Sequence, residues 1–174
     1  RETRVVLLAA GPFAHTARPV MEACLRAGTH YLDITGELGV LEMAAALDAR
    51  ARQAGVMLMP GAGFDVVPSD CLAAHLARRL PTATSLTLAF QGLGGVSRGT
   101  LATIAENAGR GGAVRRGGRI VPVPAAWKQM EVDFGRGPVT VTTIPWGDVS
   151  TAYHSTGIPD VAVYTRVPAR QVRM

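Results

Sequence analysis

The stretch RVVLLAAGPFAHTARPVMEACLRAGTHYLDITG, residues 4–36, carries the signals of a strand, a helix and a second strand in succession. Its first part, Arg4–Ala10, is a short apolar run that favours a strand buried on both faces of a parallel sheet. A helix is predicted to follow, with Thr16 as its N-cap and Gly28 at its end. The second strand is predicted at Thr29–Ile34. These residues therefore predict a β-α-β unit, which decides the fold class.

The same alternation continues to about residue 80. A helix is predicted at Leu38–Ala54, a strand at Val56–Met59 and a third helix at Ser69–Leu80. Strands that alternate with helices of about 10–15 residues are typical of a parallel sheet with right-handed crossovers. We therefore expect an α/β fold in residues 1–80.

After Pro81 the pattern changes to short strands at hairpin spacing, which is typical of an α+β segment. We expect a second domain, or part of one, in residues 81–174. Its predicted strands are Ser85–Phe90, Ala113–Arg116, Arg119–Val123, Lys128–Phe134, Val139–Thr143 and Val161–Arg166, and its predicted helices are Ser97–Ala108 and Asp148–Thr156.

Composition excludes several classes of protein. The chain has 174 residues, of which 48% are apolar and 18% are charged, so wholesale disorder is not expected. Its length suits one domain or parts of two. No apolar run reaches the roughly 20 residues of a membrane-spanning helix. Cys24 and Cys71 are too few for a disulfide scaffold or a four-ligand zinc site, and no metal site is predicted.

The net charge of +5 comes from arginine, because Lys128 is the only lysine among 18 basic residues. The densest cluster, Arg110–Arg119, is interleaved with glycine and lacks the aromatic residues or recognisable motif of a nucleic-acid site. Charged hairpin turns explain it as well, so no nucleic-acid partner is predicted.

Glycine-rich turns follow all three predicted strands of the first segment. They are Gly11-Pro12-Phe13, the stretch Asp33–Glu37, and the stretch Pro60–Asp65. In open parallel sheets, ligands bind beyond the carboxyl ends of the strands, and glycine lets the backbone approach a ligand closely. Three such turns in succession indicate a nucleotide or substrate site, although the fingerprint Gly-x-Gly-x-x-Gly is absent.

Structural roles for the same residues stay open. The glycines would also serve tight turns that bind nothing, and Asp33 and Asp65 would also cap a helix or accept local hydrogen bonds. Glu37 is interpreted as an acid in the first turn of the next helix. In the second segment, Tyr153 and His154 would line a pocket or serve only in aromatic packing.

Four stretches together carry a family likeness: GPFAHTARPVMEACLRAGTHYLDITGE, PGAGFDVVPSDCLAAHLARRLP, LAFQGLGGVSRGT and PWGDVSTAYHSTGIPDVAVY. They resemble the saccharopine dehydrogenase-like oxidoreductases, especially the branch that contains trans-acting enoyl reductases. The resemblance implies an N-terminal NADP-binding Rossmann domain followed by a smaller α+β domain that closes over the substrate. Residues 1–80 would be the C-terminal half of the Rossmann-like sheet, without its GxxGxxG half. Residues 81–174 would be part of the substrate and dimerisation domain.

The resemblance also implies roles for individual residues. The nicotinamide side of NADP would lie along Gly11, Pro12 and Phe13. Other cofactor-binding positions implied in the same crevice are Asp33, Thr35, Gly36, Gly61, Gly63 and Phe64. Candidates for the proton donor, on chemical type alone, are Asp65, Tyr153 and His154.

The resemblance implies NADP-dependent hydride transfer to or from a lipid-like enoyl or carbonyl-derived substrate. Because the phosphate-binding loop does not occur in these residues, activity is expected of a longer enzyme and not of this chain alone. The alternative hypothesis is a non-catalytic binding or partner module that keeps the fold without a working cofactor site and exposes a sheet edge. The expected partners are a small-molecule or lipid-like substrate and, in a homodimer, a second copy. A cytoplasmic location is expected, with peripheral association with a membrane left open.

Overall fold

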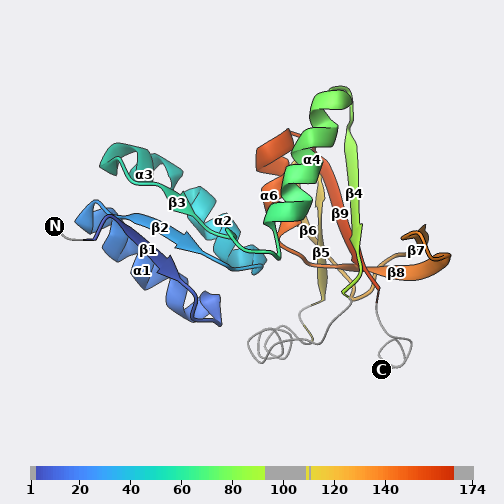
Figure 1. Cartoon of the computed structure of the whole chain (residues 1–174), viewed down its shortest axis with the longest axis horizontal. Helices are drawn as coiled ribbons and strands as arrows, with labels where there is room; N and C mark the ends of the chain where they lie inside the picture. The colour runs from blue at the N-terminus through green and yellow to red at the C-terminus, as the bar shows by residue number, and fades with distance from the viewer. Residues whose placement is uncertain (1–2, 93–108, 110, 167–174) are drawn as a thin grey trace.

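The computed structural model describes residues 3–92, 109 and 111–166, which form two β-sheets that lie side by side (Figure 1). The first unit is a parallel sheet with helices α1, α2 and α3, and the second unit is a mixed sheet with helices α4 and α6. The predicted fold class, a parallel α/β sheet followed by an α+β segment, is confirmed. The predicted helix at residues 97–108 lies outside the described residues. Within the described part of the chain, no helix has the length and apolar character needed to cross a membrane.

The parallel sheet of the first unit has the strand order β1-β2-β3. Its strands are β1 (Val5–Leu8), β2 (His30–Asp33) and β3 (Leu58–Met59), and its helices are α1 (Phe13–Ala27), α2 (Leu38–Ala46) and α3 (Asp48–Ala54). The single helix predicted at residues 38–54 is therefore two helices, which meet at Leu47. Gly28 and Gly55 end α1 and α3 in the left-handed conformation, as glycine permits.

Helix α1 begins three residues before the predicted cap. The Glu37 carboxylate accepts hydrogen bonds from the backbone N–H groups of Phe13 (2.7 Å) and Ala14 (2.8 Å). The Thr16 hydroxyl instead donates to the carbonyl oxygen of Ala10 (2.8 Å). The prediction of Thr16 as N-cap is wrong, because the cap is a carboxylate from the loop after β2, 24 residues away from Phe13 in the sequence.

The helices of the first unit pack on one face of its sheet. Tyr31, Val6 and Leu8 lie on this face, in the core that contains Met21 of α1 and residues of α2. The alternate residues Val5 and Leu7 are on the opposite face, where Leu7 is 61% exposed. The prediction that the first strand is buried on both faces is wrong for the described residues, since helices cover only one of them.

The mixed sheet of the second unit has the order β6-β5-β9-β8-β7, and β4 pairs in parallel with β9. Its strands are β4 (Ser85–Phe90), β5 (Gly112–Arg116), β6 (Arg119–Val123), β7 (Gln129–Asp133), β8 (Pro138–Ile144) and β9 (Asp160–Thr165), and its helices are α4 (Val67–Arg79) and α6 (Asp148–Thr156). Both predicted hairpins, β5–β6 and β7–β8, are present. Helix α4 precedes the predicted boundary at residue 81, yet its buried Ala73 belongs to the core of this second sheet.

Two methionines test how the first core is built. Met21 is fully buried, whereas Met57, the residue before β3, is 45% exposed. We expect Met21→Ala to lower the free energy of unfolding by about 2–5 kcal/mol, because it leaves a cavity in the core. Met57→Ala, the matched control, should change it by less than about 0.5 kcal/mol. Urea denaturation measures both, and equal losses would contradict the one-sided packing.

Candidate functional site

The loops after β1, β2 and β3 meet at the carboxyl ends of the parallel strands, and the carboxylate of Asp33 joins two of them. Asp33 is fully buried at the end of β2. One of its oxygens accepts hydrogen bonds from the backbone N–H groups of Thr35 (2.9 Å) and Gly61 (2.8 Å), and the other accepts from the Tyr31 hydroxyl (2.7 Å). The Asp33 carbonyl oxygen also accepts from the N–H of Ala62 (2.7 Å). The turn after β2 and the loop after β3 are therefore fixed to each other.

The hydroxyl of Tyr31 is held in its protonated form. Burial raises the pKa of Tyr31 well above its usual range, and the hydrogen bond to Asp33 raises it further. The phenol therefore remains a hydrogen-bond donor to the carboxylate across the physiological pH range.

Glu37 joins the first loop to the second. Its backbone N–H donates to the hydroxyl oxygen of the buried Thr35 (3.0 Å), and its carboxylate caps α1. The interpretation of Glu37 as a first-turn acid of the next helix is wrong, since the carboxylate lies at the N-terminus of the preceding helix. A negative charge already occupies this positive end of the helix dipole.

The second and third loops touch at glycines. A Cβ atom added to Gly63 would lie 2.9 Å from the Cβ of Ile34, which is closer than side chains pack. Gly61 has a positive φ of 71°, a conformation that favours glycine. The Asp65 side chain lies beside Gly36. The structure thus brings together the predicted residues of all three loops, while their roles in cofactor binding stay predictions.

The side chains of Phe64 and Asp65 lie at the surface of this site. Phe64 is 89% exposed, an unusual position for a large apolar side chain. Partial desolvation raises the pKa of Asp65. The Asp65 carbonyl oxygen accepts a hydrogen bond from the indole N–H of Trp146 (2.6 Å), and Gly147 packs against Val66. The turn before α6 therefore rests on the third loop, a contact that sequence reasoning missed.

Tyr153 and His154 lie in a different group of contacts. The guanidinium of Arg115 lies over the Tyr153 ring, 4.5 Å from its centroid. The His154 Nε2 atom is 4.0 Å from the Glu42 carboxylate. Among the described residues, no hydrogen bond or ion pair joins Asp65 to Tyr153 or His154. The three predicted proton donors are thus divided between two places.

Arg115 forms the centre of the second group and joins the two units. Its side chain is 4% exposed and donates to the carbonyl oxygens of Val149 and Gly118, both at 2.8 Å, and to the carboxylate of Glu42 in α2 (2.7 Å). The Ser150 hydroxyl donates to the same Glu42 oxygen. Sequence reasoning missed this role, because Arg115 belongs to a basic cluster that was interpreted as charged hairpin turns.

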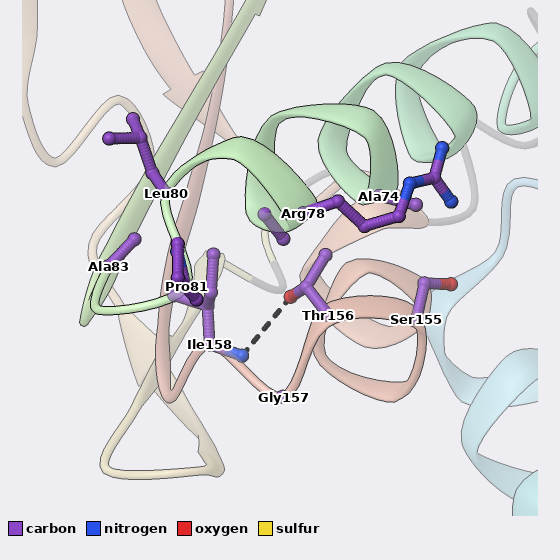
Figure 2. Close-up of a pocket in the computed structure, with 10 residues that line it drawn as sticks. Ala74, Arg78, Leu80, Pro81, Ala83, Ser155, Thr156, Gly157 and Ile158 are labelled. Carbon is purple, nitrogen blue, oxygen red and sulfur yellow. Dashed lines mark hydrogen bonds between the residues drawn. The ribbon is translucent and has the colours of Figure 1, made fainter.

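A cavity of about 490 Å³ lies elsewhere, at the C-terminal ends of α4 and α6 (Figure 2). Leu80, Pro81 and Ile158 are among its lining residues, and the N–H of Ile158 donates to the Thr156 hydroxyl (3.1 Å) beside it. It contains none of the residues predicted for the functional site.

No family model matches the chain. Proteins with similar sequences include enzymes named as reductases and oxidoreductases. The chain is 38% identical over 77 residues to a trans-acting enoyl reductase of Mycobacterium ulcerans, a match that covers 44% of this chain and 18% of that protein. It is 37% identical over 71 residues to a saccharopine dehydrogenase-like oxidoreductase of Mus musculus, covering 40% of this chain and 17% of that protein. The chain thus matches less than a fifth of the length of these relatives.

Among solved structures, the chain is similar to a Bacillus subtilis protein described as an oxidoreductase, YvaA, with a TM-score of 0.36 and 15% sequence identity. The match covers 95% of this chain and 47% of that protein. The predicted resemblance to trans-acting enoyl reductases and saccharopine dehydrogenase-like oxidoreductases is confirmed by the sequence relatives.

Two adjacent arginines test the junction between the units. Arg115→Met should lower the free energy of unfolding by about 3–5 kcal/mol, because it removes the buried cation that bonds to Glu42 and to the carbonyl oxygens of Val149 and Gly118. Arg116→Met removes a partly exposed ion pair with Asp160 and a guanidinium 5.5 Å from the centroid of the Trp127 ring, and should cost less than about 1 kcal/mol. Chemical denaturation of the two variants measures the difference, and similar losses would contradict a structural role special to Arg115.

Asp33→Asn tests the joint between the loops. The neutral amide has one acceptor oxygen and accepts more weakly than the carboxylate, so the bonds from Thr35 and Gly61 weaken and the Tyr31 hydroxyl loses its acceptor, at a cost of about 1–3 kcal/mol. We expect the Gly61 amide to exchange with solvent faster in Asp33→Asn, as measured by hydrogen exchange and NMR. The control Asp48→Asn changes an exposed carboxylate and should leave that rate unchanged. An unchanged rate in Asp33→Asn would show that the joint does not depend on its charge.

Proposed function

We propose that this chain contributes the nicotinamide side of the cofactor domain, and part of the substrate domain, to an NADP-dependent oxidoreductase. The reaction would be hydride transfer to or from a lipid-like enoyl or carbonyl-derived substrate. The observation that carries the proposal is the sequence similarity of part of this chain to trans-acting enoyl reductases and to a saccharopine dehydrogenase-like oxidoreductase. The choice of NADP, the lipid-like substrate and a homodimer rest on this resemblance.

The three joined loops support the proposal, because parallel α/β sheets bind nucleotides beyond the carboxyl ends of their strands. Bound NADP would supply the hydride chemistry. Gly11, Pro12 and Phe13 would face its nicotinamide ring. The N–H groups at the start of α1 are already bonded to Glu37, so a cofactor phosphate would have to displace that carboxylate to bind there. The phosphates are therefore assigned to elements outside this loop.

Asp65 is the favoured proton donor among the three candidates. It lies beside Gly36 in the group of joined loops, and its raised pKa favours the protonated form that a general acid needs. Tyr153 and His154 are engaged at the junction with Arg115 and Glu42. In the proposed reaction, those two residues position the second unit and do not deliver the proton.

The alternative, a non-catalytic partner module, also finds support in the structure. Among the described residues the outer edge of β1 pairs with no strand, and Val5 and Leu7 are exposed beside it. In the oxidoreductase, further strands of a longer protein would pair with this edge; in the partner module, another chain would do so. Binding of NADPH separates the two hypotheses.

The test is an NADPH titration, followed by cofactor fluorescence, of the natural polypeptide that carries these residues. We expect Phe64→Ala to weaken binding about tenfold, equivalent to about 1.4 kcal/mol of apolar contact with the ring. Because Phe64 is so exposed, its removal should leave the free energy of unfolding unchanged.

Leu72→Ala is the matched control, since Leu72 is an exposed apolar residue on α4 outside the joined loops. It should leave NADPH affinity as it is. Absence of NADPH binding to the unmodified protein would favour the partner module, and equal affinity in Phe64→Ala would remove Phe64 from the site.

A further inference from the structure

Trp146, in the turn between β8 and α6, is held in one orientation by the second unit. Its backbone N–H donates to the carbonyl oxygen of Ile144 (3.0 Å), and its own carbonyl oxygen accepts from the N–H of Val149 (3.0 Å). The indole packs against the ring of Phe90 in β4, with 5.0 Å between the ring centroids. Because the backbone and the ring both contact the second unit, that unit sets the direction of the indole N–H.

The indole N–H reaches the third loop of the candidate site. It donates to the carbonyl oxygen of Asp65 (2.6 Å), 81 residues away in the sequence, and it is the one polar group that a tryptophan side chain has. The next residue of the turn contacts the next residue of the loop, since a Cβ added to Gly147 would lie 2.9 Å from Cγ2 of Val66. Two adjacent contacts from the second unit thus fix the peptide between Asp65 and Val66.

The carboxyl group of Asp65 has no anchor of its own. Its backbone carbonyl oxygen is bonded to Trp146, but no described residue donates a hydrogen bond to its carboxyl oxygens. The side chain lies beside Gly36, where an added Cβ would be 3.7 Å from the Asp65 Cβ and 3.8 Å from its Oδ2. The place of this carboxyl group therefore depends on where its backbone is held, and hence on Trp146.

The protonation of Asp65 depends on the same position. Partial burial raises the pKa of Asp65, because the carboxylate is less well hydrated there than in water. If the loop moved away from Gly36 into solvent, hydration would stabilise the carboxylate and the pKa of Asp65 would decrease towards its ordinary value. A titration of this group therefore shows whether the loop is held in place.

We propose that Trp146 is the positioning residue through which the second unit holds the Asp65 carboxyl group beside Gly36. The use of that position in proton transfer rests on the role of Asp65 in the proposed function, whereas the position itself does not. In the proposed oxidoreductase, the substrate domain thus sets the place of the proton donor through a single indole N–H.

The test compares two replacements of tryptophan by phenylalanine in the natural polypeptide that carries these residues. Trp146→Phe keeps an aromatic ring and removes the N–H that bonds to Asp65. Trp127→Phe is the matched control, because the Trp127 ring lies beside Arg116 and Lys128, away from the third loop. The measurement is a titration of the Asp65 carboxyl ¹³C resonance by NMR.

In the unmodified protein, the midpoint of the Asp65 titration should lie above the ordinary aspartate value of about 3.9. In Trp146→Phe it should fall by about half a pH unit, because the released loop exposes the carboxyl group to water. Trp127→Phe should leave the midpoint unchanged. A merely structural role for Trp146 would lower the free energy of unfolding in urea without moving this midpoint.

A second measurement uses the unmodified protein and does not require Trp146→Phe to fold. The indole N–H of Trp146 should exchange with solvent more slowly than that of Trp127, because it is bonded to a carbonyl oxygen. Equal exchange rates would overturn the proposal, as would an Asp65 midpoint that is unmoved in Trp146→Phe or moves equally in Trp127→Phe. Neither measurement uses a cofactor, so absence of NADPH binding would contradict the proposed function alone.

Discussion

The hydrogen bonds to the Asp33 carboxylate are the interaction on which the geometry of the candidate site depends. They come from the strand itself, from the turn that follows it and from the loop after the next strand. Without this acceptor, a phenol and two backbone N–H groups would be buried unpaired, each at a cost of about 1–3 kcal/mol. The first loop depends on the same residue indirectly, because the Thr35 turn that Asp33 fixes also holds Glu37, which caps α1. One buried charge thus sets the relative positions of three loops.

A second buried polar group sets the relation between the two units. Each unit has its own apolar core, one around Met21 and Tyr31 and the other around Val161 and Val163. Arg115 of one unit meets Glu42 of the other in a junction of directional hydrogen bonds. Apolar contacts join the units as well, because Leu38 of α2 packs against the second core and Leu41 lies beside Gly147. Directional bonds of this kind tolerate little change of angle or distance. The candidate site therefore lies beside a junction in which Arg115 and Ser150 of the second unit both donate hydrogen bonds to Glu42 of the first.

Sequence patterns correctly predicted the helix ends and turns that depend on residues close together in the chain. Gly28 ends its helix because glycine adopts positive φ, and the hairpin β5–β6 forms at the glycine turn between two strand-like runs. The meeting of the three loops was also predictable, since the ends of parallel strands share one edge of a sheet. The start of α1 was not predictable, because its cap comes from Glu37 in another loop. Nor could residue spacing show that Arg115 turns inward while its neighbour Arg116 lies at the surface.

The uncovered face of the parallel sheet connects the fold to the proposed function. The strand register aligns Leu7 with Leu32 and Leu32 with Met59, which places three apolar side chains in one row across the face opposite the helices. Parallel sheets normally bury such rows beneath a second layer of helices. In the proposed oxidoreductase, that layer and the strands beside β1 belong to the cofactor domain of the longer protein, and they would also supply the phosphate-binding loop. In the proposed oxidoreductase, the exposed row that contains Leu7 would be covered by the same part of the cofactor domain that would carry the phosphate-binding loop.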